Sequence, residues 1–167
     1  MLKDYLVQLY DYTDWANRRV WECVAKVEDD VYFADRDFSV GSLYDQLLHT
    51  MGVELWWLSY LDTGNIIFLT EDEVKAYEDR KVFRQRWDDV ARKNKVYLAN
   101  LTPDELQRKV HPDFWDDDEP SITVAQAIIQ VTQHSLDHRA QTMTLLHQLG
   151  YEGTNQDFLT FLHEQKK

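Results

Sequence analysis

The stretch TVAQAIIQVTQHSLDHRAQTMTLLHQLG, residues 123–150, decides the fold class of this chain. Apolar side chains recur along it at helical spacing, and this face includes Val124, Ile128, Val131, Leu145 and Leu149. Gly150 follows the last apolar residue and is a typical helix-ending residue. The pattern predicts one long helix over residues 123–149, buried along part of its circumference.

The same periodicity predicts three more long helices and one short one. The long helices are expected at residues 2–27, 43–61 and about 82–101, and the short one at about 155–164. Ser42 is expected to cap the second helix, Thr70 to cap an acidic first turn and Asn155 to cap the last helix.

Four long helices predict an all-α protein, a four-helix bundle that forms one domain over residues 1–167. Only five glycines and three prolines are present, which leaves little turn chemistry for an all-β fold. Val110 and residues 122–124 are candidates for a small hairpin between the third and fourth long helices. The connections at residues 28–41 and 102–123 are long enough to cross an end of the bundle, so a simple up-down topology is not required.

The composition disfavours several classes of partner. The formal net charge of −12 repels phosphate backbones and anionic membranes, so neither nucleic acid nor a membrane is expected as a partner. No signal peptide and no apolar run long enough to span a membrane is apparent. The single cysteine, Cys23, excludes an intramolecular disulfide, fits a cytoplasmic location and is expected to be a small core residue.

Three of the six histidines are candidates for a metal site. His134 and His138 are spaced i, i+4, which places both imidazoles on one face of a helix with Cβ atoms about 5–6 Å apart. His49 belongs to the apolar second helix and can complete a set of three nitrogens in the bundle core. Three protein ligands leave coordination positions open, as in catalytic rather than structural metal sites.

The spacing alone also allows less specific interpretations, because His-x-x-x-His occurs often by chance and a buried histidine is usually a hydrogen-bonded core residue. The protease motif His-Glu-x-x-His is excluded because Ser135 follows the first histidine. Asp137 occupies the acidic position of an inverted motif, but the default expectation for it is a solvated surface residue. The acidic run at residues 116–119 is expected to be a solvated loop tip.

At these residues the chain resembles the DinB-like family, which is also grouped with YfiT-type metal-dependent hydrolases and bacterial thiol transferases. The resemblance covers nearly the whole length and rests on three short motifs. These are Tyr12-Thr-Asp-Trp15-Ala-Asn17, then Leu47-Leu-His49 followed by Glu54 and Trp57, and finally His134-Ser-Leu-Asp-His138-Arg-Ala140-Gln141. The family usually has glycine where Ala140 stands.

The resemblance implies a four-helix bundle in which the helices are not arranged in sequential order. It also implies a divalent metal ion, often nickel or zinc, held here by His49, His134 and His138, and it implies frequent homodimers. The family as a whole has no single reaction: some members transfer a low-molecular-weight thiol, and others are grouped with isomerases.

Two classes of function follow from these expectations. The first is a metal-dependent transferase that joins a low-molecular-weight thiol to an electrophilic small molecule, or a hydrolase in which water replaces the thiol. Tyr12, Trp15, Trp56 and Trp57 could line its apolar pocket, although each is also an ordinary core aromatic. No general base can be named. The alternative is a non-enzymatic metal-containing stress or binding module, and a third possibility is that the histidines are structural.

Overall fold

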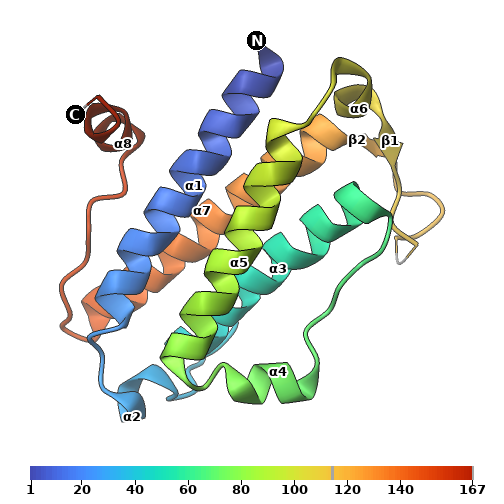
Figure 1. Cartoon of the computed structure of the whole chain (residues 1–167). Helices are drawn as coiled ribbons and strands as arrows, with labels where there is room; N and C mark the ends of the chain where they lie inside the picture. Colours follow the sequence, from blue (N-terminus) through green and yellow to red (C-terminus); the bar gives the residue numbers. More distant parts are fainter. Residues whose placement is uncertain (114, 167) are drawn as a thin grey trace.

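The computed structural model describes residues 1–113 and 115–166, and within them four long helices form the expected bundle (Figure 1). These are α1 (Leu2–Val24), α3 (Leu43–Thr63), α5 (Arg80–Ala99) and α7 (Val124–Gln148). The shorter elements are α2 (Asp29–Tyr32), α4 (Glu71–Ala76), α6 (Pro103–Gln107), β1 (Lys109–Val110), β2 (Ile122–Thr123) and α8 (Phe158–Glu164). The all-α class is therefore confirmed.

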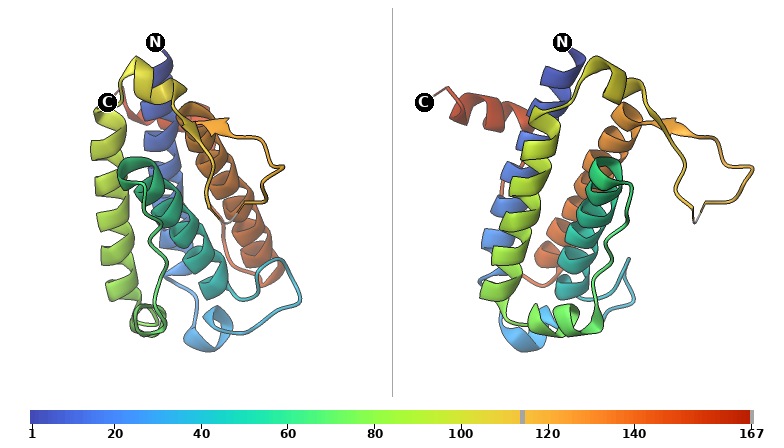
Figure 2. Two further views of the ribbon diagram at one scale, coloured as in Figure 1. Left: turned by 90° about the vertical axis from the view of Figure 1, so that its right-hand side faces the viewer. Right: turned by 45° about the vertical axis from the view of Figure 1, so that its right-hand side comes forward.

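The four long helices are not arranged in sequential order, as the resemblance implied. α1 packs against α5 and α7, and α3 also packs against α5 and α7. α1 and α3 therefore occupy diagonal positions, as do α5 and α7, whereas α3 and α5 are neighbours. Figure 2 shows that the segments containing α2 and α4 cross one end of the bundle, whereas α6 and the two strands lie at the other end. The long connections make this arrangement possible.

The predicted hairpin is present in a minimal form. β1 and β2 pair antiparallel over two residues each, with Lys109 opposite Thr123 and Val110 opposite Ile122. Between the strands, the acidic residues 116–119 are exposed, as expected for a solvated loop tip.

Side-chain caps explain where the helices begin. Ser42 caps α3, and its Oγ accepts a hydrogen bond from the Asp45 amide at 3.1 Å while Asp45 Oδ2 accepts one from the Ser42 amide at 2.9 Å. Thr70 caps α4 in the same way. The expected Asn155 cap is wrong, because Asp157 Oδ1 accepts from the Leu159 amide at 2.7 Å and α8 therefore begins at Phe158.

The end of α1 and the presence of two short helices also differ from expectation. α1 ends at Val24 rather than at residue 27, although Val27 is still buried. The short helices α2 and α6 were not predicted, since four or five residues are too few to show a helical period.

The core consists of two apolar clusters along the bundle axis. One includes Met51, Phe83 and Leu146 near the α2 and α4 end, and the other includes Leu58 and Ile128 nearer the strands. Cys23 is half-buried against the first cluster, and burial raises the pKa of its thiol. Among the described residues, no helix has the length and apolar character needed to cross a membrane.

Candidate metal centre

The three candidate histidines lie together between α3 and α7. Nε2 of His49 on α3 and Nε2 of His134 on α7 are 3.0 Å apart. One potential ligand atom from each of His49, His134 and His138 lies within 4.8 Å of the other two. The antiparallel packing of α3 and α7 therefore brings together residues that are 85 positions apart in the sequence.

This geometry fits the donor set of a divalent metal ion. Two imidazole nitrogens that bind one ion at ~2.1 Å, with a bond angle between a right angle and a tetrahedral angle, are ~3.0–3.4 Å apart. The separation of the His49 and His134 nitrogens falls within that range. In the metal-free protein, the same distance allows one neutral ring to donate its N–H to the other.

The orientation of His138 is fixed by a buried glutamine that sequence reasoning missed. His138 Nδ1 lies 3.0 Å from Oε1 of Gln46, whose side chain is fully buried on α3. Because a carboxamide oxygen only accepts, Nδ1 carries the proton and Nε2 keeps its lone pair for an ion. The signal that could have identified Gln46 is its position three residues before His49, one turn away on the same helix.

Burial favours the neutral form of all three imidazoles. Burial lowers the pKa of His134 to about 4, and the neighbouring His138 and His49 rings contribute in the same direction. Burial also lowers the pKa of His49 and, together with the His49 ring, that of His138. Asp137 opposes the shifts of His134 and His138 from an exposed position, so it is the surface residue expected by default. Neutral imidazoles are the form that binds metal ions.

A buried carboxylate lies one to two turns beyond His49 on α3 and connects the four long helices. Glu54 accepts hydrogen bonds from Tyr10 on α1 at 3.2 Å and Asn17 on α1 at 2.7 Å. It also accepts longer ones from Trp87 on α5 and Ser135 on α7, both at 3.4 Å. Burial raises the pKa of Glu54, and the hydrogen bonds from Trp87, Asn17 and Tyr10 act in the opposite direction.

Arg139 extends this network on α7. Its guanidinium donates to Asn17 Oδ1 at 3.0 Å, to Ser135 Oγ at 3.1 Å and to Gln156 Oε1 at 2.9 Å, and it lies over the ring of Tyr12. Ser135 and Arg139 directly follow the two histidines of α7. Their buried contacts fix the rotation of α7 about its axis and hence the direction in which both imidazoles point.

The structure divides the four aromatic residues expected to line one pocket. Trp56 and Trp57 line a cavity of about 480 Å³ together with Trp115, Ile122, Gln126 and Gln130. Tyr12 and Trp15 instead pack against Phe158 and Phe161 of α8 and do not line this cavity. Trp15 Nε1 also donates to Glu164 at 2.9 Å, which helps to hold α8 on α1.

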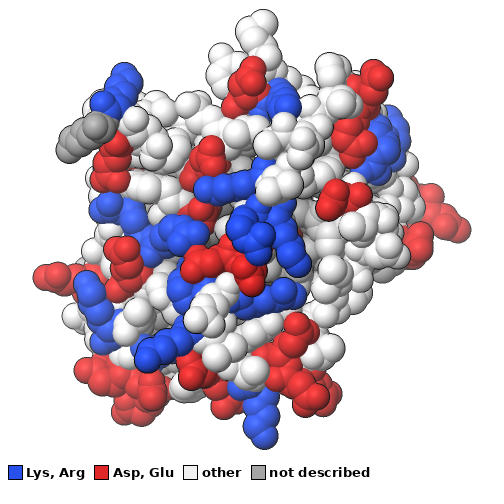
Figure 3. All heavy atoms as spheres, in the orientation of Figure 1, with Lys and Arg blue, Asp and Glu red and all other residues white. Residues whose placement is uncertain are grey.

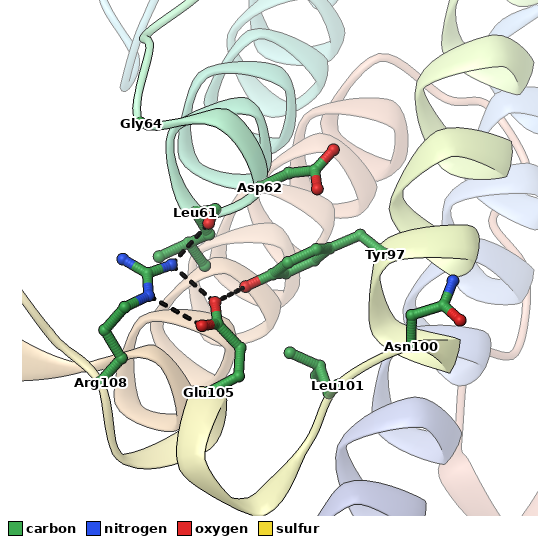
Figure 4. Close-up of a pocket in the computed structure, with 8 residues that line it drawn as sticks. All are labelled: Leu61, Asp62, Gly64, Tyr97, Asn100, Leu101, Glu105 and Arg108. Atoms are coloured by element: carbon green, nitrogen blue, oxygen red, sulfur yellow. Dashed lines mark hydrogen bonds and ion pairs between the residues drawn. The ribbon is translucent and has the colours of Figure 1, made fainter.

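A separate cavity of about 410 Å³ lies between the ends of α3 and α5 and the short helix α6 (Figure 4). Arg108 donates to Glu105 Oε2 at 2.9 Å and to the Leu61 carbonyl at 2.6 Å, while Tyr97 donates to Glu105 Oε1 at 2.9 Å. These polar groups pair with one another and tie α6 to the end of α3. They give no sign of a ligand site.

Comparison with known proteins agrees with this arrangement. The sequence profile of the DinB family matches residues 1–167, the full length of the chain. Protein DinB of Bacillus subtilis (strain 168) is 21% identical over 168 residues, which cover 99% of this chain and 98% of that protein. With a bundle of the expected helix order and three converging histidines, the full-length match leads to one conclusion: the chain belongs to the DinB family.

Proposed function

We propose that this protein binds a divalent metal ion, nickel or zinc, through His49, His134 and His138 and uses it to transform a small molecule. The reaction that we favour transfers a low-molecular-weight thiol to an electrophile, with metal-dependent hydrolysis as the variant. One observation carries the proposal: ligand atoms of three imidazoles lie within 4.8 Å of one another. Burial lowers the pKa of all three, which favours the neutral form that binds metal ions. Three imidazoles suit several divalent transition metals, including nickel and zinc.

The residues of the chain have separate parts in this proposal. The three imidazoles hold the ion, and Gln46 holds the His138 ring in the tautomer that can bind it. His49 and His134 are only half-buried, which leaves the outer side of the centre accessible to a substrate. A bound ion would supply Lewis acidity, which lowers the pKa of a thiol or water that it coordinates.

The surface charges support a small-molecule substrate rather than nucleic acid. Figure 3 shows Lys and Arg side chains gathered over one face, with Asp and Glu side chains among them. Arg18 lies 2.7 Å from Asp88, and Lys95 lies 2.8 Å from Asp14, so basic groups of α1 and α5 are paired with acids. Paired cations add little to the binding of a phosphate backbone. We also propose a cytoplasmic location, on the basis of the lone cysteine.

Metal content is the first test of this proposal. We expect near-stoichiometric metal, measured by elemental mass spectrometry, in untagged protein purified without a metal column. His138→Ala should lose the metal. His147→Ala should retain it, because His147 is an exposed histidine on the last turn of the same helix. If the wild type and both variants hold no metal, even after they are reloaded with zinc and nickel, the proposal is refuted.

Turnover is the second test. Metal-loaded protein should consume a thiol in the presence of a model electrophile such as a chlorodinitrobenzene, and the rate should follow the metal content. Equal rates after the metal is stripped would exclude the transferase. Bound metal without thiol consumption or hydrolysis would favour the alternative function, a metal-containing binding module.

A further inference from the structure

The tryptophan pocket, defined above by Trp56, Trp57, Trp115, Ile122, Gln126 and Gln130, is lined partly by residues of α3 and α7, the two helices that carry the three histidines. Trp56 follows His49 by seven residues on α3, and Gln130 precedes His134 by four on α7. Because the two helices are antiparallel neighbours, both steps lead in the same direction from the histidines (Figure 1). Four to seven residues correspond to ~6–10 Å along a helix. The pocket therefore begins one to two turns from the candidate metal centre.

The walls of the pocket are apolar and aromatic. The stacked rings of Trp56 and Trp57 have centroids 4.3 Å apart, and Trp115 meets the Trp57 ring edge-on at 6.0 Å. Within the described part of the lining, the polar groups are the carboxamides of Gln126 and Gln130 and the indole N–H groups of the tryptophans. Gln126 Oε1 already accepts from the Thr123 amide at 2.8 Å. Among the residues that the structure describes, no charged side chain lines the pocket, so a charged ligand group would find no counterion from them.

We propose that this pocket binds a flat, uncharged aromatic part of the electrophilic substrate, whose reactive end reaches the histidine centre. The inference rests on the proposed function and specifies its substrate class. A cavity of about 480 Å³ is large enough for a ring system, and tryptophan faces favour flat π surfaces. The spacing between pocket and histidines requires a linker of a few atoms between the ring and the reacting group.

A series of hydroxamates tests this proposal without any turnover. Acetohydroxamate binds a metal ion but has no tail, whereas phenylalkyl hydroxamates with one to four methylenes place a ring at increasing distance from the ion. In calorimetry on metal-loaded protein, one tail length should bind at least ~10-fold tighter than acetohydroxamate, as burial of a ring implies. An anionic carboxyphenyl tail of the same length should lose most of that gain.

Three variants locate the effect. Trp56→Ala should abolish the gain from the tail and leave the affinity for acetohydroxamate unchanged. Gln130→Trp, which fills the pocket from an exposed position, should do the same even if Trp56→Ala is unstable. Trp15→Ala removes a half-buried tryptophan of the α1–α8 contact and should retain the full gain.

The outcomes separate this inference from the proposed function. If acetohydroxamate binds and no tail length improves affinity, the pocket proposal is wrong while the metal site stands. If the protein holds no metal, the proposed function has failed first. Sedimentation of the same variants tests whether a second copy of the chain occupies the pocket instead. If the wild type is a dimer and both Trp56→Ala and Gln130→Trp are monomers, the pocket is a dimer contact and the proposal is overturned.

Discussion

Gln46 fixes the orientation of the His138 ring, because its fully buried Oε1 accepts a hydrogen bond from Nδ1–H. We predict that Gln46→Leu lowers metal affinity by roughly 10- to 100-fold, since the ring loses its fixed tautomer and orientation. Gln46→Glu should retain the affinity, because a carboxylate also accepts from Nδ1. Competition titration against a chromogenic zinc chelator measures both. Equal affinities for Gln46→Leu and the wild type would contradict this role.

The depressed histidine pKa values predict how metal binding responds to acid. Metal ions compete with protons for imidazole nitrogens, and an ordinary histidine with a pKa near 6.5 begins to lose that competition below pH 6.5. Burial lowers the pKa of His134 to about 4 and lowers those of His49 and His138. The affinity for the metal ion should therefore be nearly constant from pH 8 to 6.5. It should begin to fall at a lower pH than the metal affinity of a solvent-exposed three-histidine peptide does. A steep loss that begins above pH 6.5 would contradict the neutral, buried centre.

The sequence predicted the three histidines but not the residues that orient them. An i, i+4 histidine pair is conspicuous, whereas Gln46 looks like any polar residue on a helix until the buried face is known. Glu54 was recognised only as part of a family motif. Its four hydrogen-bond donors lie on three other helices, so its role depends on tertiary packing that no local pattern encodes.

Helix α7 ends in a hydrogen-bonded turn that requires a left-handed residue. Gly150 has φ +83°, while the Tyr151 amide donates to the Leu146 carbonyl at 2.9 Å and the Gly150 amide to His147 at 3.1 Å. This is a Schellman motif. Gly150→Ala should lower the free energy of unfolding by ~1 kcal/mol, because alanine disfavours positive φ although space for its Cβ is available.

Gly52 provides a control with the opposite sign. It lies within α3, where an added Cβ would meet only Leu69 Cδ1 at 3.7 Å, an ordinary contact distance. Gly52→Ala should raise the free energy of unfolding by ~0.5–1 kcal/mol, because glycine is a poor residue for a helix interior. Urea titration measures both variants. Changes of the same sign would refute the backbone argument.

The long helices were predictable because each shows its apolar period over several turns. Their ends were less so, since they depend on which of several side chains forms the cap. Asn155 and Asp157 are both good capping residues, and in the structure Asn155 instead accepts from the Asp157 amide at 2.7 Å. The diagonal placement of α1 and α3 could not be read from periodicity, because a helical stripe identifies the buried face but not the helix that covers it.

At the scale of the whole molecule, Glu54 is the point where the four long helices meet. Burial raises the pKa of Glu54 above its ordinary value, so the folded protein binds this proton more tightly than the unfolded chain does. Its contribution to stability is then fully present below about pH 4.5 and is lost as pH rises through the folded-state pKa. Glu54→Gln, which cannot ionise, lacks this dependence.

We therefore predict that the wild type gains stability relative to Glu54→Gln as the pH falls from 8 to 4.5. Urea unfolding of both proteins at several pH values measures the difference, in which the other titrating groups cancel. The opposite slope would mean that the donors from Tyr10, Asn17, Trp87 and Ser135 outweigh burial. Glu54 would then be a buried anion, stabilised by its hydrogen-bond donors and by the charge of Arg139, which contacts the same Asn17 and Ser135 side chains.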